Sequence, residues 1–178
     1  MTSSPAPMIS IGGPLPSSEP LGLLTDCHRR IEAALRVLAE ASRWHDPLDA
    51  AQRQSFSRAL RFFREMAPKH TADEEQSLFP RLRQLGVAPL ELQVLEADHQ
   101  EAYRWHGEVE ALGEIRLEPG WTAPQRARYT EVIGAMDTLY RRHIDIEDNV
   151  IFPAAKRLLP PEQQEQVRRE MVGRRAIQ

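Results

Sequence analysis

The chain has 178 residues, of which 41% are hydrophobic and 28% charged, and its formal net charge is −3. A chain of this length can bury a core large enough to fold without disulfides, and the single cysteine, Cys27, excludes an intramolecular disulfide. The charge lacks the basic excess of a nucleic-acid-binding domain, and no apolar run approaches the roughly 18 residues of a membrane span. We therefore expect a folded globular protein with no nucleic-acid or membrane partner.

Residues 1–20 differ in composition from the rest of the chain. They contain five prolines and five serines, and they lack lysine and arginine. A secretory signal needs a basic start and a continuous apolar segment, and neither occurs here. We predict a flexible arm over 1–20 and a cytoplasmic protein.

From Leu21 onward, apolar residues recur every three or four positions, which is typical of helices, and no stretch alternates as a strand would. Four long helices joined by short connections favour an antiparallel up-down-up-down four-helix bundle over 21–158. The segment 159–178 would then hold a short helix and a tail. The predicted helices cover about 21–44, 48–85, 89–115, 122–158 and 162–172.

Prolines, a glycine and capping residues mark the joints between these helices. An Asp-Pro pair at Asp46 predicts the N-cap of the second helix, and Thr122 with Gln125 predicts a capping box for the fourth. Gly86 ends the second helix. Pro68 lies inside that helix, where we expect a kink.

Each long helix carries a histidine in the apolar stripe that should face the core, and two helices place a glutamate four residues later. Residues four apart share a helix face, so these polar side chains would point into the bundle. Buried imidazole and carboxylate groups are costly unless they are paired, whereas a metal cation satisfies all of them. Imidazole suits iron, zinc, copper and nickel, and carboxylate adds a preference for harder ions such as iron and manganese. The candidate ligands are His28, His70, Glu74, His99, His143 and Glu147.

The two His-Glu segments are copies of one motif. His70–Pro80 matches His143–Pro153 at an offset of 73 residues, and both read H-x3-E-[ED]-[QN]-x-[LI]-F-P. Two helical hairpins related by a pseudo-two-fold axis would each supply one lone histidine and one His-Glu pair. If both glutamates bridge, each of two metals receives two imidazoles and two carboxylate oxygens. An additional oxo or hydroxo bridge would still leave a position open for a small ligand.

The order of these ligands along residues 21–158 resembles the hemerythrin-like (HHE cation-binding) domain family. The resemblance implies a non-haem di-iron centre, with two iron ions bridged by Glu74 and Glu147. Oxygen-carrying hemerythrins place a further histidine one turn after the third-helix ligand, where this chain has Tyr103. The pattern is therefore closer to the bacterial iron-centre repair and regulatory members. We expect Tyr103 to lean over the open metal position, with a core tyrosine as the alternative.

Several side chains near the candidate ligands have two interpretations. Glu75 and Asp148 either face solvent or orient the ligands from outside. His106 either packs in the core or acts from outside the ligand set, and Cys27 is expected to be an inert packed thiol. A solvated face is predicted for the C-terminal arginines, which are Arg168, Arg169, Arg174 and Arg175.

The predicted function is a cytoplasmic di-iron protein that binds or senses O2, NO or peroxide. One alternative is an enzyme that consumes peroxide or NO at the open iron position. A second is an iron donor for damaged iron centres, and a third is an interaction module whose stability depends on metal. The sequence points to a small diatomic or peroxide ligand and to no particular protein partner.

Overall fold

The computed structural model describes residues 19–176, and within this range every regular element is helical. The predicted arm over 1–20 lies outside the described residues apart from Glu19 and Pro20. The helices are α1 (Pro20–Ala41), α2 (Ala50–Glu65), α3 (Ala67–Asp73), α4 (Phe79–Gln84), α5 (Pro89–Leu117), α6 (Ala123–Ile146), α7 (Phe152–Leu158) and α8 (Pro161–Ala176). Two five-residue π-helical turns join them, η1 (Glu74–Leu78) and η2 (Glu147–Ile151).

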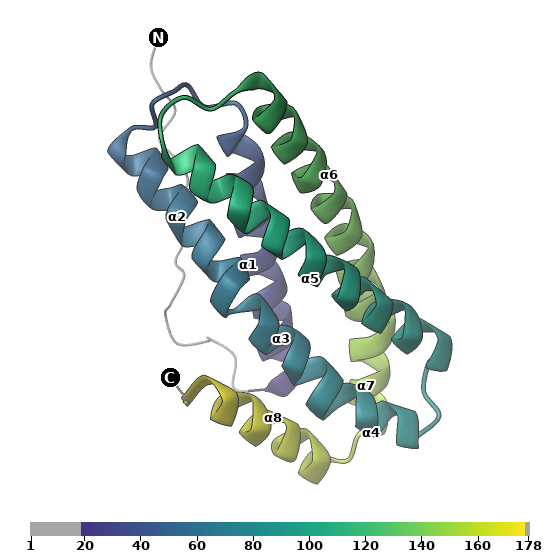
Figure 1. Ribbon diagram of the computed structural model, residues 1–178. Helices are drawn as coiled ribbons and strands as arrows, with labels where there is room; N and C mark the ends of the chain where they lie inside the picture. Colours follow the sequence, from purple (N-terminus) through teal and green to yellow (C-terminus); the bar gives the residue numbers. More distant parts are fainter. Residues whose placement is uncertain (1–18, 177–178) are drawn as a thin grey trace.

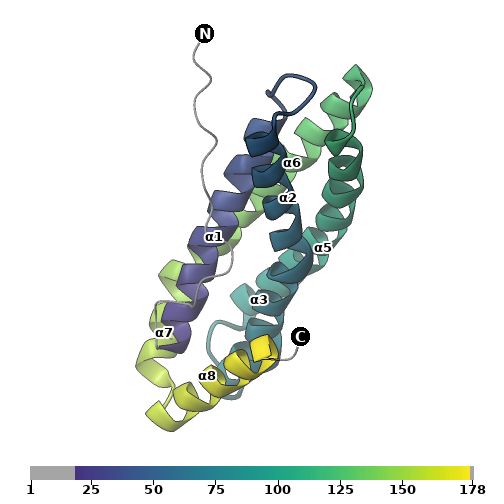
Figure 2. The same cartoon turned by 90° about the vertical axis from the view of Figure 1, so that its left-hand side faces the viewer.

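Four rows of helix form an antiparallel bundle (Figure 1). The first row is α1, the second is α2 followed by α3 and α4, the third is α5, and the fourth is α6 followed by α7. Each row packs against two neighbours: α1 lies between α2 and α6, and α5 lies opposite α1. The predicted all-α four-helix bundle is confirmed. The short C-terminal helix, α8, crosses one end of the bundle and contacts α1, α3 and η1 (Figures 1 and 2). Among residues 19–176, no helix is both long and apolar enough to cross a membrane.

Capping boxes begin two of the bundle helices. At α6, the Thr122 side chain accepts from the backbone N–H of Gln125, and the Gln125 side chain accepts from the Thr122 N–H, as predicted. At α2 the same arrangement involves Asp49 and Gln52, where the Asp49 carboxylate accepts from the Gln52 N–H at 2.8 Å. Each box satisfies backbone donors that the first helical turn leaves unpaired.

The predicted N-cap at Asp46 is therefore wrong by three positions. The Asp46 carboxylate instead accepts from the Gly120 N–H at 2.7 Å and from the buried Arg116 guanidinium at 3.4 Å. These contacts tie the α1–α2 connection to the α5–α6 connection. Local sequence favoured Asp46 because it precedes a proline, but a long-range partner occupies its carboxylate.

The second row of the bundle is interrupted where a kink was expected. Met66 separates α2 from α3, two residues before Pro68. Proline has no N–H and its ring crowds the preceding turn, so the helix changes course here. The fourth row, predicted as one helix over 122–158, is interrupted by η2.

The two π turns begin at the two candidate glutamate ligands. The backbone N–H of Phe79 donates to the Glu74 carbonyl, and that of Phe152 donates to the Glu147 carbonyl. Each phenylalanine precedes a proline, which cannot donate to the preceding turn. Such single π turns are frequent at functional sites. They occur at the same position in both copies of the repeat, and the repeated Phe-Pro pair was the sequence signal that could have indicated them.

Apolar side chains form two core clusters, one toward each end of the bundle. Along each row the candidate ligands fall between the two clusters. Leu24 and Ile31 flank His28 in α1, and Leu95 and Ala102 flank the histidine of α5. The polar level of the bundle is thus enclosed by apolar packing on both sides.

Candidate metal centre

The six predicted ligand side chains converge between the four rows of helix, and all six are buried. They form two groups of four, and within each group one potential ligand atom per residue lies within 4.8 Å of the others. The first group is His28, His70, Glu74 and Glu147, and the second is Glu74, His99, His143 and Glu147. Both glutamates belong to both groups.

Each group takes its histidines from one helical hairpin. The rings of His28 and His70, from the first hairpin, have centroids 5.0 Å apart, and those of His99 and His143, from the second, are 4.7 Å apart. The glutamates come one from each hairpin. This is the pseudo-two-fold arrangement expected from the repeat.

The Nε2 atoms of the histidines surround the glutamate oxygens. The N–O separations are 3.0 Å for His28–Glu147, 3.2 Å for His70–Glu74, 3.2 Å for His99–Glu74 and 3.3 Å for His143–Glu147. Even so, no hydrogen-bond donor among the described residues is aligned on the oxygens of either glutamate. The Nε2 atoms of His28, His70 and His99 also have no hydrogen-bond partner there. Buried polar atoms without partners are costly. A cation at the centre of each group would satisfy these atoms together.

Two outer carboxylates hold histidines from the opposite hairpin. The Nδ1–H of His28 donates to Asp148 at 2.9 Å, and that of His99 donates to Glu75 at 2.8 Å. Donation from Nδ1 leaves the Nε2 lone pair directed at the glutamates, which is the tautomer a metal ligand needs. Of the two interpretations drawn from the sequence, the geometry supports orientation of the ligands. Glu75 and Asp148 occupy equivalent positions in the repeat.

Asp98 lies beside a third histidine and was missed by sequence reasoning. One carboxylate oxygen lies 3.6 Å from Nδ1 of His143, and the other binds Arg142. The residue immediately precedes a candidate ligand, so on a helix it points about 100° away from it. Its neighbour His143 lies on α6, and the spacing of residues along α5 does not predict a contact with another helix. The Nδ1 atoms of His70 and His143 have no hydrogen-bond partner among the described residues.

The two candidate bridging glutamates titrate differently in the protein without metal. Burial, reinforced by the neighbouring Glu147, raises the pKa of Glu74 well above its usual range. Burial also opposes ionisation of Glu147, but His143 and His28 outweigh it and hold that pKa well below its usual range. Two adjacent buried carboxylates cannot both ionise without compensating charge. A cation shared between them would supply that charge.

Cys27 adjoins His28 but belongs to neither group. Its side chain is buried, and burial raises the pKa of its thiol to about 12. The thiol is therefore protonated at neutral pH, in line with the expected inert packed cysteine.

His106 packs beside the site without joining it. Its Nε2 lies 2.8 Å from the hydroxyl of the buried Tyr140, and its ring contacts Phe63. Burial, with a smaller contribution from His99, lowers the pKa of His106 to about 4. The imidazole is therefore neutral, and it lies half-buried at the edge of the core, outside both groups of candidate ligands.

The depressed pKa of His106 predicts a loss of stability in acid. The unfolded chain takes up this proton near pH 6.5 and the folded chain only near pH 4, so stability falls as the pH drops through this window. The loss is at most about 3 kcal/mol. His106→Gln should show a shallower decline in unfolding free energy from pH 7 to 4, with His45→Gln, an exposed loop histidine, as the matched control. An NMR titration in which His106 protonates near pH 6.5 would contradict the prediction.

Tyr103 does not lie where the sequence placed it. Its side chain is 74% exposed, on the wall of a pocket of about 290 Å³ that Glu75, His99 and His106 also line. His99 lies toward one edge of the buried face of α5, which also holds Leu95 and Ala102. Four residues turn a helix about 40° beyond one full turn, which carries Tyr103 past that edge into solvent. Both expectations, a ring over the metal position and a core tyrosine, are wrong.

Two of the four C-terminal arginines hold a buried carboxylate next to the site. Arg174 donates to Asp73 at 2.9 Å and to the Ser77 hydroxyl at 2.7 Å, and Arg175 lies 2.6 Å from the other Asp73 oxygen. These contacts fasten α8 to the end of α3 and to η1. The predicted solvated face is wrong for this pair. It is right for Arg168 and Arg169, which pair with Glu165.

A four-helix bundle that encloses two buried His/Glu groups defines a class of metal-binding all-α proteins. The sequence matches the hemerythrin HHE cation binding domain over residues 19–156. The chain therefore belongs to the hemerythrin HHE cation-binding domain family, as the ligand order indicated. Comparison with curated proteins and with solved structures gave no match.

Proposed function

We propose that the two groups hold two iron ions, one in each group, and that the protein binds or senses O2, NO or peroxide in the cytoplasm. Glu74 and Glu147 would bridge the ions together with an oxo or hydroxo group. His28 and His70 would complete one ion's ligands, and His99 and His143 the other's. When bound, the ions supply a redox-active centre with a position open to a small ligand.

The sharing of both glutamates between the groups carries this proposal. A carboxylate has two oxygens, so it can serve two ions about 3.5–4 Å apart, as in other binuclear sites. With two bridging carboxylates, each ion receives two imidazoles and two carboxylate oxygens. The unbonded glutamate oxygens and the histidine Nε2 atoms are the ligand atoms this arrangement requires.

The chemistry of the donors supports iron. Both groups contain imidazole and carboxylate only, and the nearby thiol of Cys27 stays outside them. Carboxylates prefer harder ions such as iron and manganese, while imidazole suits iron, zinc and copper. Iron satisfies both preferences, and manganese or zinc are the competing results of a metal analysis.

The residues around the ligands would keep them in place. Asp148 and Glu75 hold the rings of His28 and His99 through Nδ1. Outer carboxylates of this kind also raise the basicity of the histidine ligand. The apolar clusters above and below limit the access of water.

Turnover of peroxide or NO is the alternative function, and one feature favours it. The pocket of about 290 Å³ beside Glu75 and His99 brings solvent-sized molecules close to the second group. A reactant that enters there could be consumed repeatedly rather than held. Iron donation to damaged iron centres is a further alternative.

The deciding experiment loads the protein with Fe²⁺ without oxygen, counts the bound iron, and mixes the product with O2, NO or H2O2 in a stopped-flow spectrometer. We expect two iron ions per chain, spin-coupled in Mössbauer spectra, and a persistent adduct. Repeated consumption of H2O2 or NO supports the enzyme alternative, and release of iron to an apo acceptor supports donation. Uncoupled mononuclear iron contradicts the bridged centre.

Tyr103→Phe should behave as the unsubstituted protein, because this side chain is exposed.

A further inference from the structure

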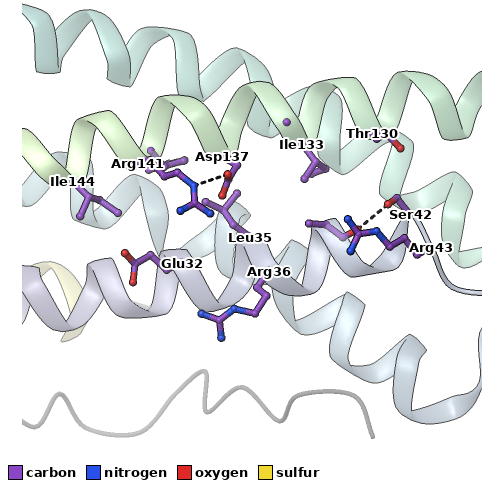
Figure 3. A pocket seen from close by; sticks show the side chains of 13 residues that line it. Glu32, Leu35, Arg36, Ser42, Arg43, Thr130, Ile133, Asp137, Arg141 and Ile144 are labelled. Atoms are coloured by element: carbon purple, nitrogen blue, oxygen red, sulfur yellow. Dashed lines mark hydrogen bonds and ion pairs between the residues drawn. The ribbon is translucent and has the colours of Figure 1, made fainter. Parts of the chain in front are cut away.

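A groove of about 490 Å³ runs between α1 and α6 (Figure 3). Its floor is apolar and almost inaccessible to solvent: Leu35 and Ile133 are 4% exposed, and Tyr140 and Ile144 are 6% exposed. None of the six candidate metal ligands lines it. Small-molecule sites commonly have such a volume, with an apolar lining and a few polar groups.

The rim of the groove carries cations that lack an anionic partner. Arg36 of α1 and Arg43, just beyond its end, line the groove, and neither side chain forms an ion pair within residues 19–176. The acidic side chains of the groove are already paired, Glu32 with Arg29 at 2.9 Å and Asp137 with Arg141 at 2.7 Å. The unpaired charge available to a ligand is therefore positive.

A glycine opens the α6 wall of the groove. Gly134 lies within α6, where glycine costs about 1 kcal/mol relative to alanine, and a Cβ at this position would meet nothing within 4 Å. No close approach of another helix requires glycine here. Its absent side chain leaves room over the floor beside Ile133.

We propose that this groove binds a medium-chain fatty acid. The carboxylate would pair with Arg36 and Arg43, because a guanidinium matches a carboxylate in charge and shape. The hydrocarbon chain would lie on Leu35 and Ile133, in the space beside Gly134. Such a site is separate from the candidate metal centre and does not depend on its metal.

The test titrates decanoate, below its micelle-forming concentration, into the full-length protein and follows binding by calorimetry and by the 13C shift of a labelled carboxyl. We expect saturable binding of one decanoate per chain. Gly134→Leu, which fills the groove with a good helix former, should weaken it by about tenfold or more, and so should the double variant Arg36→Gln/Arg43→Gln. Decanol, which lacks the charge, should bind about tenfold more weakly.

Two matched controls separate the groove from general effects. Gly107→Leu places leucine at another exposed helical glycine with open space around it, and Arg61→Gln/Arg104→Gln removes the same charge outside the groove. Both should bind decanoate as the unsubstituted protein does. The absence of saturable binding, or equal weakening in the controls, overturns the proposal. So does a dimer in sedimentation that only Gly134→Leu disrupts, because the groove is then an interface between copies.

Discussion

In the proposed two-ion centre, replacement of Glu147 by glutamine should reduce the bound metal from two ions per chain to less than one. Glu147 belongs to both ligand groups, so one substitution removes a carboxylate oxygen from each. The amide is neutral and cannot compensate two cations in a buried site. Metal analysis after gel filtration of anaerobically loaded protein measures the effect, and circular dichroism reports whether the variant remains folded.

His70→Gln is the matched comparison, because His70 belongs to one group only. This variant should keep the ion held by the second group, and its metal content should fall to about one ion per chain. The metal-loaded protein should also melt at a higher temperature than the chelated protein, since metal binding to the folded chain adds to its stability. Two tightly held ions in Glu147→Gln, or equal metal loss in both variants, would show that the glutamates do not bridge.

The double substitution Arg174→Ala/Arg175→Ala should destabilise the protein by about 3 kcal/mol or more. Asp73 is fully buried, and both of these arginines pair with its carboxylate. Breaking a buried ion pair by removing one side leaves an uncompensated charge, which costs about 3–5 kcal/mol. Burial already raises the pKa of Asp73, against the opposing effect of Arg175 and Arg174, so the carboxyl of the variant should take up a proton more readily. Urea unfolding at neutral pH measures the free energy.

The control for this prediction lies on the same helix. Arg168→Ala/Arg169→Ala removes equal charge from α8, but these arginines pair with the exposed Glu165. Exposed ion pairs contribute about 0–1 kcal/mol, so this variant should stay close to the unsubstituted protein. Similar losses in both double variants would show that α8 contributes general helix stability instead of a specific contact with Asp73.

Periodicity and spacing were enough to predict the bundle and to select the six residues that meet in its centre. A helix repeats every 3.6 residues, so apolar positions three and four apart define its inward face. A histidine within that face and a glutamate four residues later both point into the core, about one turn apart. The motif repeated from His70 to His143 also predicted the symmetric pairing of the two hairpins. Each copy of this motif also contains a π turn, at Glu74 and at Glu147, which the hydrophobic periodicity did not predict.

Only the tertiary structure decided which outer groups support this centre. Asp98 meets His143, and Arg174 and Arg175 meet Asp73, across gaps of 45 or more residues in the chain. Asp98 points about 100° away from the candidate ligand that follows it on α5. Arg174 and Arg175 belong to α8, and spacing along the chain does not specify where that helix packs. For Asp46 and Tyr103 the local sequence led to a wrong prediction. The Asp46 carboxylate accepts from distant residues instead of capping a helix, and the helical rotation along α5 places Tyr103 at the surface. By itself, the sequence determined the apolar stripe of each helix and the histidine within it, because helical geometry is local. The contacts between helices depend on how those helices pack, and that is a property of the folded chain.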